Sequence, residues 1–134
     1  MIRFLQIEAE TDKMSRKVLI VDDVLFVRKT IADIFIKKGF HVVGEASNAR
    51  DALKMYKEFK PDLVTMDVVM PGRSGIDATK DIIALDKEAR VIIISAMEHE
   101  NLVMDAINAG ARDYIIKPFK ESEILKSVDK IFGK

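Results

Sequence analysis

The chain has 134 residues, of which 49% are hydrophobic and 33% charged, which suits one folded domain with a single core. Its 22 Lys and Arg residues balance 22 Asp and Glu residues, so there is no basic footprint for nucleic acid or for an anionic membrane surface. The sequence contains no cysteine, which excludes disulfides, thiolate metal sites and a thiol nucleophile.

The first 15 residues, MIRFLQIEAETDKMS, are too mixed in charge for a signal peptide and lack a continuous apolar stretch. No apolar run elsewhere approaches the ~20 residues of a membrane span, so we expect no insertion in a membrane. We therefore predict a flexible N-terminal extension over residues 1–15, followed by one domain over residues 16–134.

Strand-like and helix-like segments alternate along the rest of the chain. Five short segments are rich in β-branched residues, and three of them are nearly continuous apolar runs, which is typical of parallel strands covered on both faces. These strand segments are 17–22, 41–46, 62–67, 90–95 and 113–117. Apolar residues at helical spacing follow each strand, and Gly39 and Gly110 supply stop signals after the first and fourth helices.

Strict alternation of strands and helices predicts an α/β fold with a doubly wound parallel sheet and right-handed crossovers. With five strands, the flavodoxin-like (βα)5 arrangement with strand order 2-1-3-4-5 is favoured over the other common order. In such sheets ligands bind beyond the carboxyl ends of the strands, at the point where the strand order reverses.

Four of the five predicted strands end in a polar residue that can take part in chemistry. The second strand ends in GEAS and offers no comparable group. Any one of the polar residues has an ordinary explanation, such as a turn or a helix N-cap, but the whole set at one edge indicates a site. The set consists of Asp22 and Asp23 after the first strand, Asp67 after the third, Ser95 after the fourth and Lys117 after the fifth.

Three converging carboxylates should raise one another's pKa unless a cation lies between them. Oxygen ligands without Cys or a nearby His suit Mg²⁺, which binds one or two carboxylates and keeps several waters. A Lys and a hydroxyl beside the acids can contact phosphoryl oxygens. The residues therefore predict a phosphoryl-transfer site with Asp67 as candidate nucleophile.

The segments VLIVDD, DLVTMDVVMPGRSGI, VIIISA and AGARDYIIKPF together resemble the receiver domain of two-component response regulators. The resemblance runs from about residue 16 to residue 132, and it is strongest to single-domain, chemotaxis-type (CheY-type) receivers. It implies a cytoplasmic phosphoprotein of a phosphorelay, which is not an enzyme beyond its own phosphorylation and slow autodephosphorylation.

The resemblance also implies a role for each site residue. Asp67 would accept a phosphoryl group from a histidine kinase, and Lys117 would pair with the acids and then with the phosphoryl group. The Mg²⁺ ligands would be Asp23, Asp67 and the Val69 carbonyl, with Asp22 acting chiefly through water. Ser95 would move toward the phosphoryl group while Tyr114 rotates inward as the switch aromatic, and a cis peptide bond would precede Pro118.

Output would then pass through the surface formed by the fourth helix, fifth strand and fifth helix to a downstream protein, either the flagellar switch or another regulator. Val69 and Met97, two residues after Asp67 and Ser95 respectively, cannot orient an attacking water by hydrogen bonding because both are apolar. We therefore expect slow spontaneous loss of the phosphoryl group and, where turnover is fast, a separate phosphatase.

Two other functions are compatible with parts of the pattern. A Mg²⁺-dependent phosphohydrolase of the haloacid dehalogenase-like type would also use an aspartyl phosphate, but it needs a second acid where this chain has Val69. A receiver-like module regulated without phosphorylation is the other alternative. It gives no reason to keep clustered acids at a desolvation cost.

Overall fold

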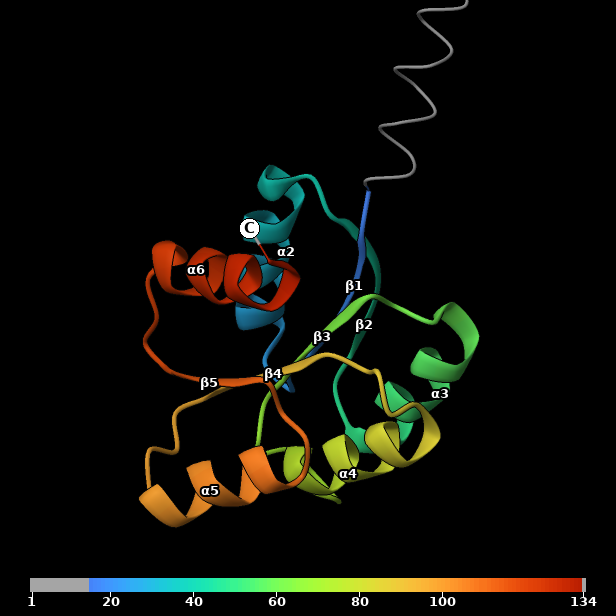
Figure 1. Ribbon diagram of the computed structural model, residues 1–134, viewed down its shortest axis with the longest axis vertical. Helices are drawn as coiled ribbons and strands as arrows, with labels where there is room; N and C mark the ends of the chain where they lie inside the picture. Colours follow the sequence, from blue (N-terminus) through green and yellow to red (C-terminus); the bar gives the residue numbers. More distant parts are fainter. Residues whose placement is uncertain (1–14, 134) are drawn as a thin grey trace, which may run out of the picture.

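A computed structural model describes residues 15–133, so nearly all of the predicted extension (residues 1–15) lies outside the described residues. Strands and helices alternate through this region without exception (Figure 1). The strands are β1 (Lys17–Val21), β2 (His41–Ala46), β3 (Leu63–Met66), β4 (Val91–Ser95) and β5 (Asp113–Ile116). The helices are α2 (Leu25–Lys38), α3 (Ala49–Phe59), α4 (Gly75–Leu85), α5 (Glu100–Asn108) and α6 (Glu121–Phe132).

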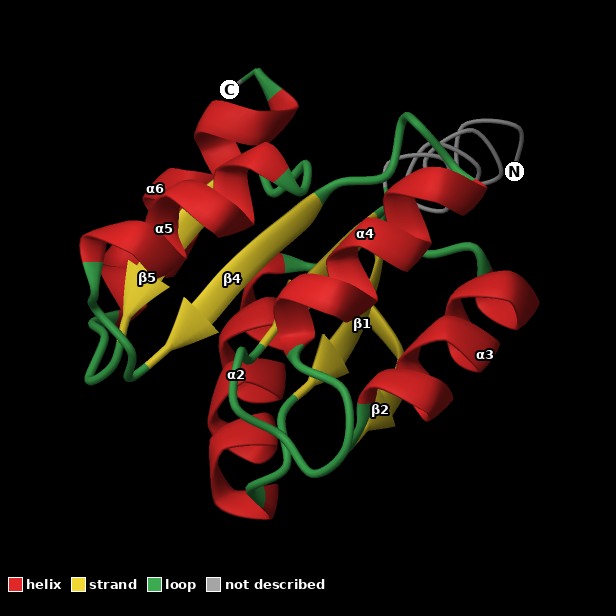
Figure 2. Cartoon of the chain, turned by 90° about the horizontal axis from the view of Figure 1, so that it is seen from below, coloured by secondary structure: helices red, strands yellow, loops and turns green. Residues whose placement is uncertain are grey.

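The strands form one parallel sheet in the order β2-β1-β3-β4-β5, which confirms the predicted flavodoxin-like fold. Helices cover both faces of this sheet (Figures 1 and 2). Strands β1, β3 and β5 end one residue earlier than predicted. Asp22, Asp67 and Lys117 therefore follow the last residue of these strands.

Two apolar layers hold the helices on the sheet. Alternate residues of the central strands face opposite ways: Leu19 and Val64 pack toward α3, α4 and α5, whereas Ile20 and Ile92 pack toward α2 and α6. All four side chains are fully buried, so each contributes on the order of 2 kcal/mol through removal of apolar surface from water. The central strands are therefore rigid supports for whatever follows their carboxyl ends.

Capping residues define the start of α3 and α4 and the end of α2. Asn48 and Ser74 accept hydrogen bonds from the backbone N–H groups of Asp51 and Asp77, which begins α3 and α4. Gly39 ends α2 with a φ of 97°, a left-handed conformation that favours glycine. No helix within residues 15–133 combines the length and the apolar character that crossing a membrane requires.

Candidate functional site

Asp22, Asp23 and Asp67 converge at the carboxyl edge of the sheet, as predicted. Each offers one carboxylate oxygen, and these oxygens lie within 4.8 Å of one another. Strands β1 and β3 are neighbours and run in parallel, so the residues that follow them meet at one edge. The backbone N–H of Asp67 donates to the Val21 carbonyl at 3.0 Å, which extends the hydrogen bonding of the two strands into the site. The cluster is therefore held by the most buried part of the fold.

Lys117 reaches this cluster from the end of β5. Its Nζ lies 2.6 Å from Oδ2 of Asp22 and 3.5 Å from Oδ2 of Asp67. Asp22 is 1% exposed and Asp67 is 6% exposed, whereas Asp23 is open to solvent. One cation therefore faces three acids, and the cluster keeps an excess of negative charge.

The pKa of Asp67 is raised above its ordinary value of 3.8. Burial is the main cause, because it disfavours the charged carboxylate. The positive charge of Lys117 opposes the shift, while the negative charges of Asp22 and Asp23 add to it. The neighbouring carboxylates thus contribute to the raised pKa of Asp67, in the direction expected from the sequence.

Gly75 lets α4 begin directly against the site. A Cβ atom at this position would lie 1.8 Å from the Asp67 carbonyl oxygen, far inside van der Waals contact. The backbone N–H of Gly75 also donates to the Val68 carbonyl at 2.9 Å. The loop between β3 and α4 is therefore folded back tightly on the residue that carries the central carboxylate.

Ser95 and Tyr114 lie on the neighbouring strands β4 and β5. Ser95 is fully buried, and its Oγ accepts a hydrogen bond from the Met97 N–H at 3.2 Å. The Tyr114 hydroxyl donates to the Met97 carbonyl, and its ring packs partly buried against the core on the α5 side. Burial raises the pKa of Tyr114, the Asp67 charge raises it further, and the Ser95 hydroxyl opposes this effect. The two predicted switch residues are thus linked through one loop residue, Met97.

The peptide bond between Lys117 and Pro118 is cis, as expected. Val69 lies in the loop between β3 and α4 with its side chain exposed, and the use of its carbonyl as a metal ligand stays a prediction. His41 and His99 are exposed.

The donor set fits Mg²⁺ in its chemistry. Three carboxylates supply hard oxygen ligands, and neither Cys nor His contributes to the cluster. Asp23 is exposed, so water molecules can complete the coordination of a cation that keeps part of its hydration shell.

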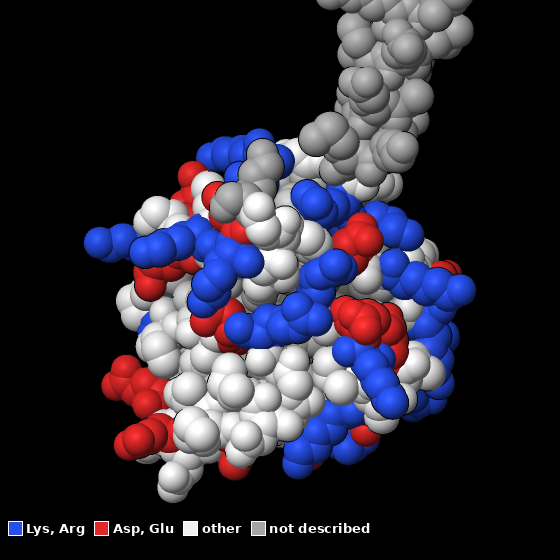
Figure 3. All heavy atoms as spheres, viewed as in Figure 1, with Lys and Arg blue, Asp and Glu red and all other residues white. Residues whose placement is uncertain are grey.

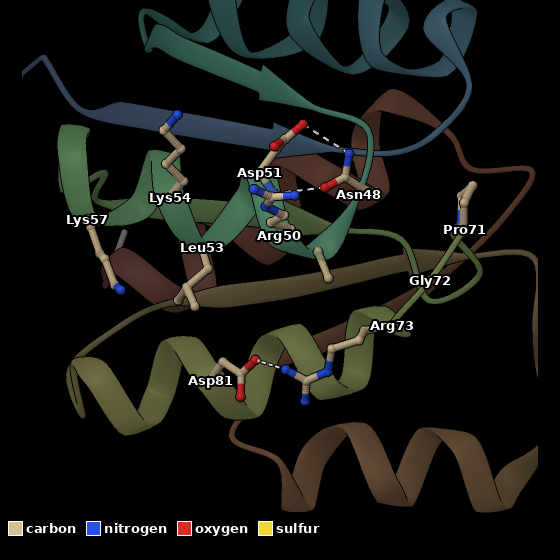
Figure 4. Close-up of a pocket in the computed structure, with 11 residues that line it drawn as sticks. Asn48, Arg50, Asp51, Leu53, Lys54, Lys57, Pro71, Gly72, Arg73 and Asp81 are labelled. Atoms are coloured by element: carbon tan, nitrogen blue, oxygen red, sulfur yellow. Dashed lines mark hydrogen bonds and ion pairs between the residues drawn. The ribbon is translucent and has the colours of Figure 1, made fainter.

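A separate hollow of about 990 Å³ lies between α3, α4 and the loop that precedes α4 (Figure 4). None of the predicted site residues lines it. Its Arg73 pairs with Asp81, and Asn48 hydrogen-bonds Asp51, so these polar side chains already have partners. The acid cluster, not this hollow, is therefore the site that the chemistry supports.

Sequence reasoning overlooked two residues beside the site, Arg28 of α2 and Glu45 of β2. An Arg28 Nη1 atom donates to the carbonyl of Asp22 at 2.7 Å, and its Nε donates to Glu45 Oε1 at 3.1 Å. The sequence does contain an indication of this contact, because the Glu45 carboxylate in GEAS lies near the end of an otherwise apolar strand and needs a partner there.

Comparisons with known proteins agree with this site. Residues 18–129 match the family model described as the response regulator receiver domain. The chain is 48% identical over 118 residues to a chemotaxis protein CheY of Thermotoga maritima, covering 88% of this chain and 98% of that one. It is 50% identical over 117 residues to CheY of Bacillus subtilis, with coverage of 87% and 98%. A solved CheX-CheY-BeF3-Mg complex from Borrelia burgdorferi contains a chain that is 39% identical, with a TM-score of 0.86 and coverage of 89% and 90%.

Proposed function

Because the chain belongs to the response regulator receiver domain family, we propose that Asp67 accepts a phosphoryl group in a Mg²⁺-dependent reaction. Members of this family are phosphorylation-activated signalling proteins and not classical enzymes. The observation that carries the proposal is the convergence of Asp22, Asp23 and Asp67 around a site that Lys117 also reaches. The similar Borrelia protein was solved with BeF3 and Mg, which supports the same chemistry here.

In the proposed transfer, Asp67 is the nucleophile, and Lys117 and Mg²⁺ stabilise the phosphoryl group. A carboxylate oxygen of Asp67 attacks the phosphorus of a phosphohistidine, the new P–O bond forms, and the P–N bond breaks as the imidazole leaves. Lys117 can contact a phosphoryl oxygen from its place beside Asp67. Mg²⁺, when bound by the acids, would neutralise charge that builds up during the transfer.

We further propose that the donor is a histidine kinase that docks over the open side of the site. Large apolar side chains flank the acids and are exposed there: Val24, Leu25 and Phe26 follow Asp23, and Val69 follows Asp67. Phe26 is 79% exposed, the highest value among the exposed large apolar residues of the described chain. Exposed apolar side chains around a reactive group suit a protein substrate better than a small one. The phosphatase that removes the group would approach from the same side.

The output of the module is proposed to pass through α5, β5 and α6, with Ser95 and Tyr114 as the switch. Met104 and Ile107 of α5 are exposed apolar residues on this surface. In Figure 3, Lys and Arg gather over α6 and α3, whereas the surface around α5 shows mainly uncharged atoms with Asp and Glu at its edge. A target that controls motility is proposed because the similar proteins in Thermotoga and Bacillus are chemotaxis proteins matched over nearly their whole length.

Incubation with acetyl phosphate and Mg²⁺, followed by intact-mass analysis, tests the proposal. We expect one phosphoryl adduct that disappears in the Asp67→Asn variant and in EDTA. An Asp33→Asn variant is the matched control, because Asp33 is an exposed acid of α2. Absence of the adduct, together with absence of BeF3 binding, would favour a module regulated without phosphorylation.

A further inference from the structure

The turn between β1 and α2 is tied to β2 by a partly buried ion pair. Glu45 lies in β2 and accepts hydrogen bonds from Nε of Arg28 at 3.1 Å and from Nζ of Lys29 at 2.8 Å. The Arg28 side chain is 15% exposed, whereas the Lys29 side chain is 61% exposed. Burial alone would raise the pKa of Glu45, but the hydrogen bonds and charges of Lys29 and Arg28 outweigh it and lower that pKa. Glu45 is therefore an ionised anchor for Arg28.

Arg28 completes the hydrogen bonding of Asp22. Three polar groups of Asp22 already have partners: its N–H donates to the Ala46 carbonyl at 3.0 Å, Oδ1 accepts from the Val24 N–H at 2.9 Å, and Oδ2 accepts from Lys117 at 2.6 Å. The remaining group, the Asp22 carbonyl, accepts from Arg28 Nη1 at 2.7 Å. A charged donor makes this bond stronger than an ordinary backbone hydrogen bond.

The bond to the Asp22 carbonyl matters for Asp23 because the two residues share one peptide unit. A peptide is planar, so fixing its carbonyl oxygen also fixes its N–H and the direction in which the Asp23 Cα lies. Asp23 is exposed, and no hydrogen bond or ion pair to its carboxylate is found among the described residues. Its place in the cluster thus depends on the backbone that carries it.

We propose that Arg28, held by Glu45, is a positioning residue for the cation site: it fixes the Asp22–Asp23 peptide so that the Asp23 carboxylate faces Asp67. This inference rests on the proposed function, in that the cation is Mg²⁺. It also gives β2 a part in the site, although the end of that strand supplies no ligand. Partners that orient metal ligands typically change metal affinity 10- to 100-fold when they are removed.

The test is the Mg²⁺ affinity of the unphosphorylated full chain, measured by NMR titration with Mg²⁺ alone. Arg28→Met should weaken Mg²⁺ binding about tenfold. Lys29→Met, which removes the exposed partner of Glu45 and has no bond to Asp22, should stay within about twofold of the wild type. Arg28→Lys, which keeps the charge but cannot span both partners, should also weaken binding and serves if Arg28→Met does not fold.

A second comparison separates positioning from general support of the fold. Glu45→Gln should weaken Mg²⁺ binding in the wild-type background and change it little in the Arg28→Met background, since Glu45 acts through Arg28. Folded Arg28 variants that bind Mg²⁺ like the wild type would overturn the inference while leaving the proposed function intact. Failure of the wild type itself to bind Mg²⁺ would overturn both.

Discussion

Replacing Asp67 with asparagine should stabilise the fold in Mg²⁺-free solution, because it removes one charge from a crowded set. At an effective dielectric constant of about 20, two unit charges 4.8 Å apart repel by about 3.5 kcal/mol, and Asp67 faces two such acids. Attraction between Asp67 and Lys117 at 3.5 Å offsets about 4.7 kcal/mol of this repulsion on the same scale. The remaining repulsion is about 2 kcal/mol, which solvent screening of the exposed Asp23 reduces.

We therefore expect the free energy of unfolding of Asp67→Asn to exceed that of the wild type by about 1 to 2 kcal/mol at pH 7. The direction of this change in the free energy of unfolding follows from the raised pKa of Asp67. Ionisation of this carboxyl in the folded state costs stability, so the penalty is absent below the ordinary pKa of 3.8 and appears as the pH rises through the higher folded-state value. The advantage of the variant should accordingly shrink as the pH falls through the folded-state pKa of Asp67 toward 3.8.

The assay is urea denaturation in EDTA, followed by circular dichroism, with Asp33→Asn as the control for loss of an exposed acid. Saturating Mg²⁺ should stabilise the wild type more than Asp67→Asn and so reduce the difference or reverse its sign. A variant no more stable than the wild type in EDTA would show that Lys117 already balances the acids, and the electrostatic reasoning would be wrong.

Gly75→Ala should lower the free energy of unfolding by about 3 kcal/mol, since its Cβ would meet the Asp67 carbonyl; an unchanged urea midpoint would contradict the close approach. The wild-type phosphoryl adduct should decay slowly, and Val69→Asn should accelerate its loss at least about tenfold by orienting water, as followed by intact mass; rapid decay of the wild type would refute the role assigned to Val69. Burial favours a higher pKa for Asp113, but hydrogen bonds from Ser127, the Tyr114 N–H and Lys130 lower it, so its stabilising effect is present above pH 3.8 and lost as the pH falls through the lowered value. Asp113→Asn should thus lower the free energy of unfolding by about 1 kcal/mol at pH 7 and less in acid, and an equal loss at both pH values would contradict the assigned ionisation.

The sheet could be predicted because parallel strands buried on both faces are continuous apolar runs, as in VLIV and VIIIS. The positions of Asp22, Asp67 and Lys117 followed from the strand order alone, since parallel strands bring their carboxyl ends to one edge. The roles of individual residues, such as Ser95 and Tyr114 as the switch, came from the resemblance to receivers and not from the strand order.

Other features depend on tertiary contacts that no local pattern encodes. The bond from Arg28 to the Asp22 carbonyl joins residues brought together by the turn after β1, and its anchor Glu45 comes from a different strand. The close approach of Gly75 to Asp67 likewise depends on how the loop before α4 folds back. Such contacts determine how well the acids are oriented, which is a matter of tenths of an ångström and not of residue type.

The most direct test of the central claim is to identify which side chain carries the phosphoryl group. Borohydride reduction of the phosphorylated protein converts an aspartyl phosphate to homoserine, and peptide mass mapping then locates the converted residue. We expect homoserine at position 67 alone, formed only after incubation with Mg²⁺. Conversion at Asp22 or Asp23 instead, or label spread over several surface acids, would contradict it.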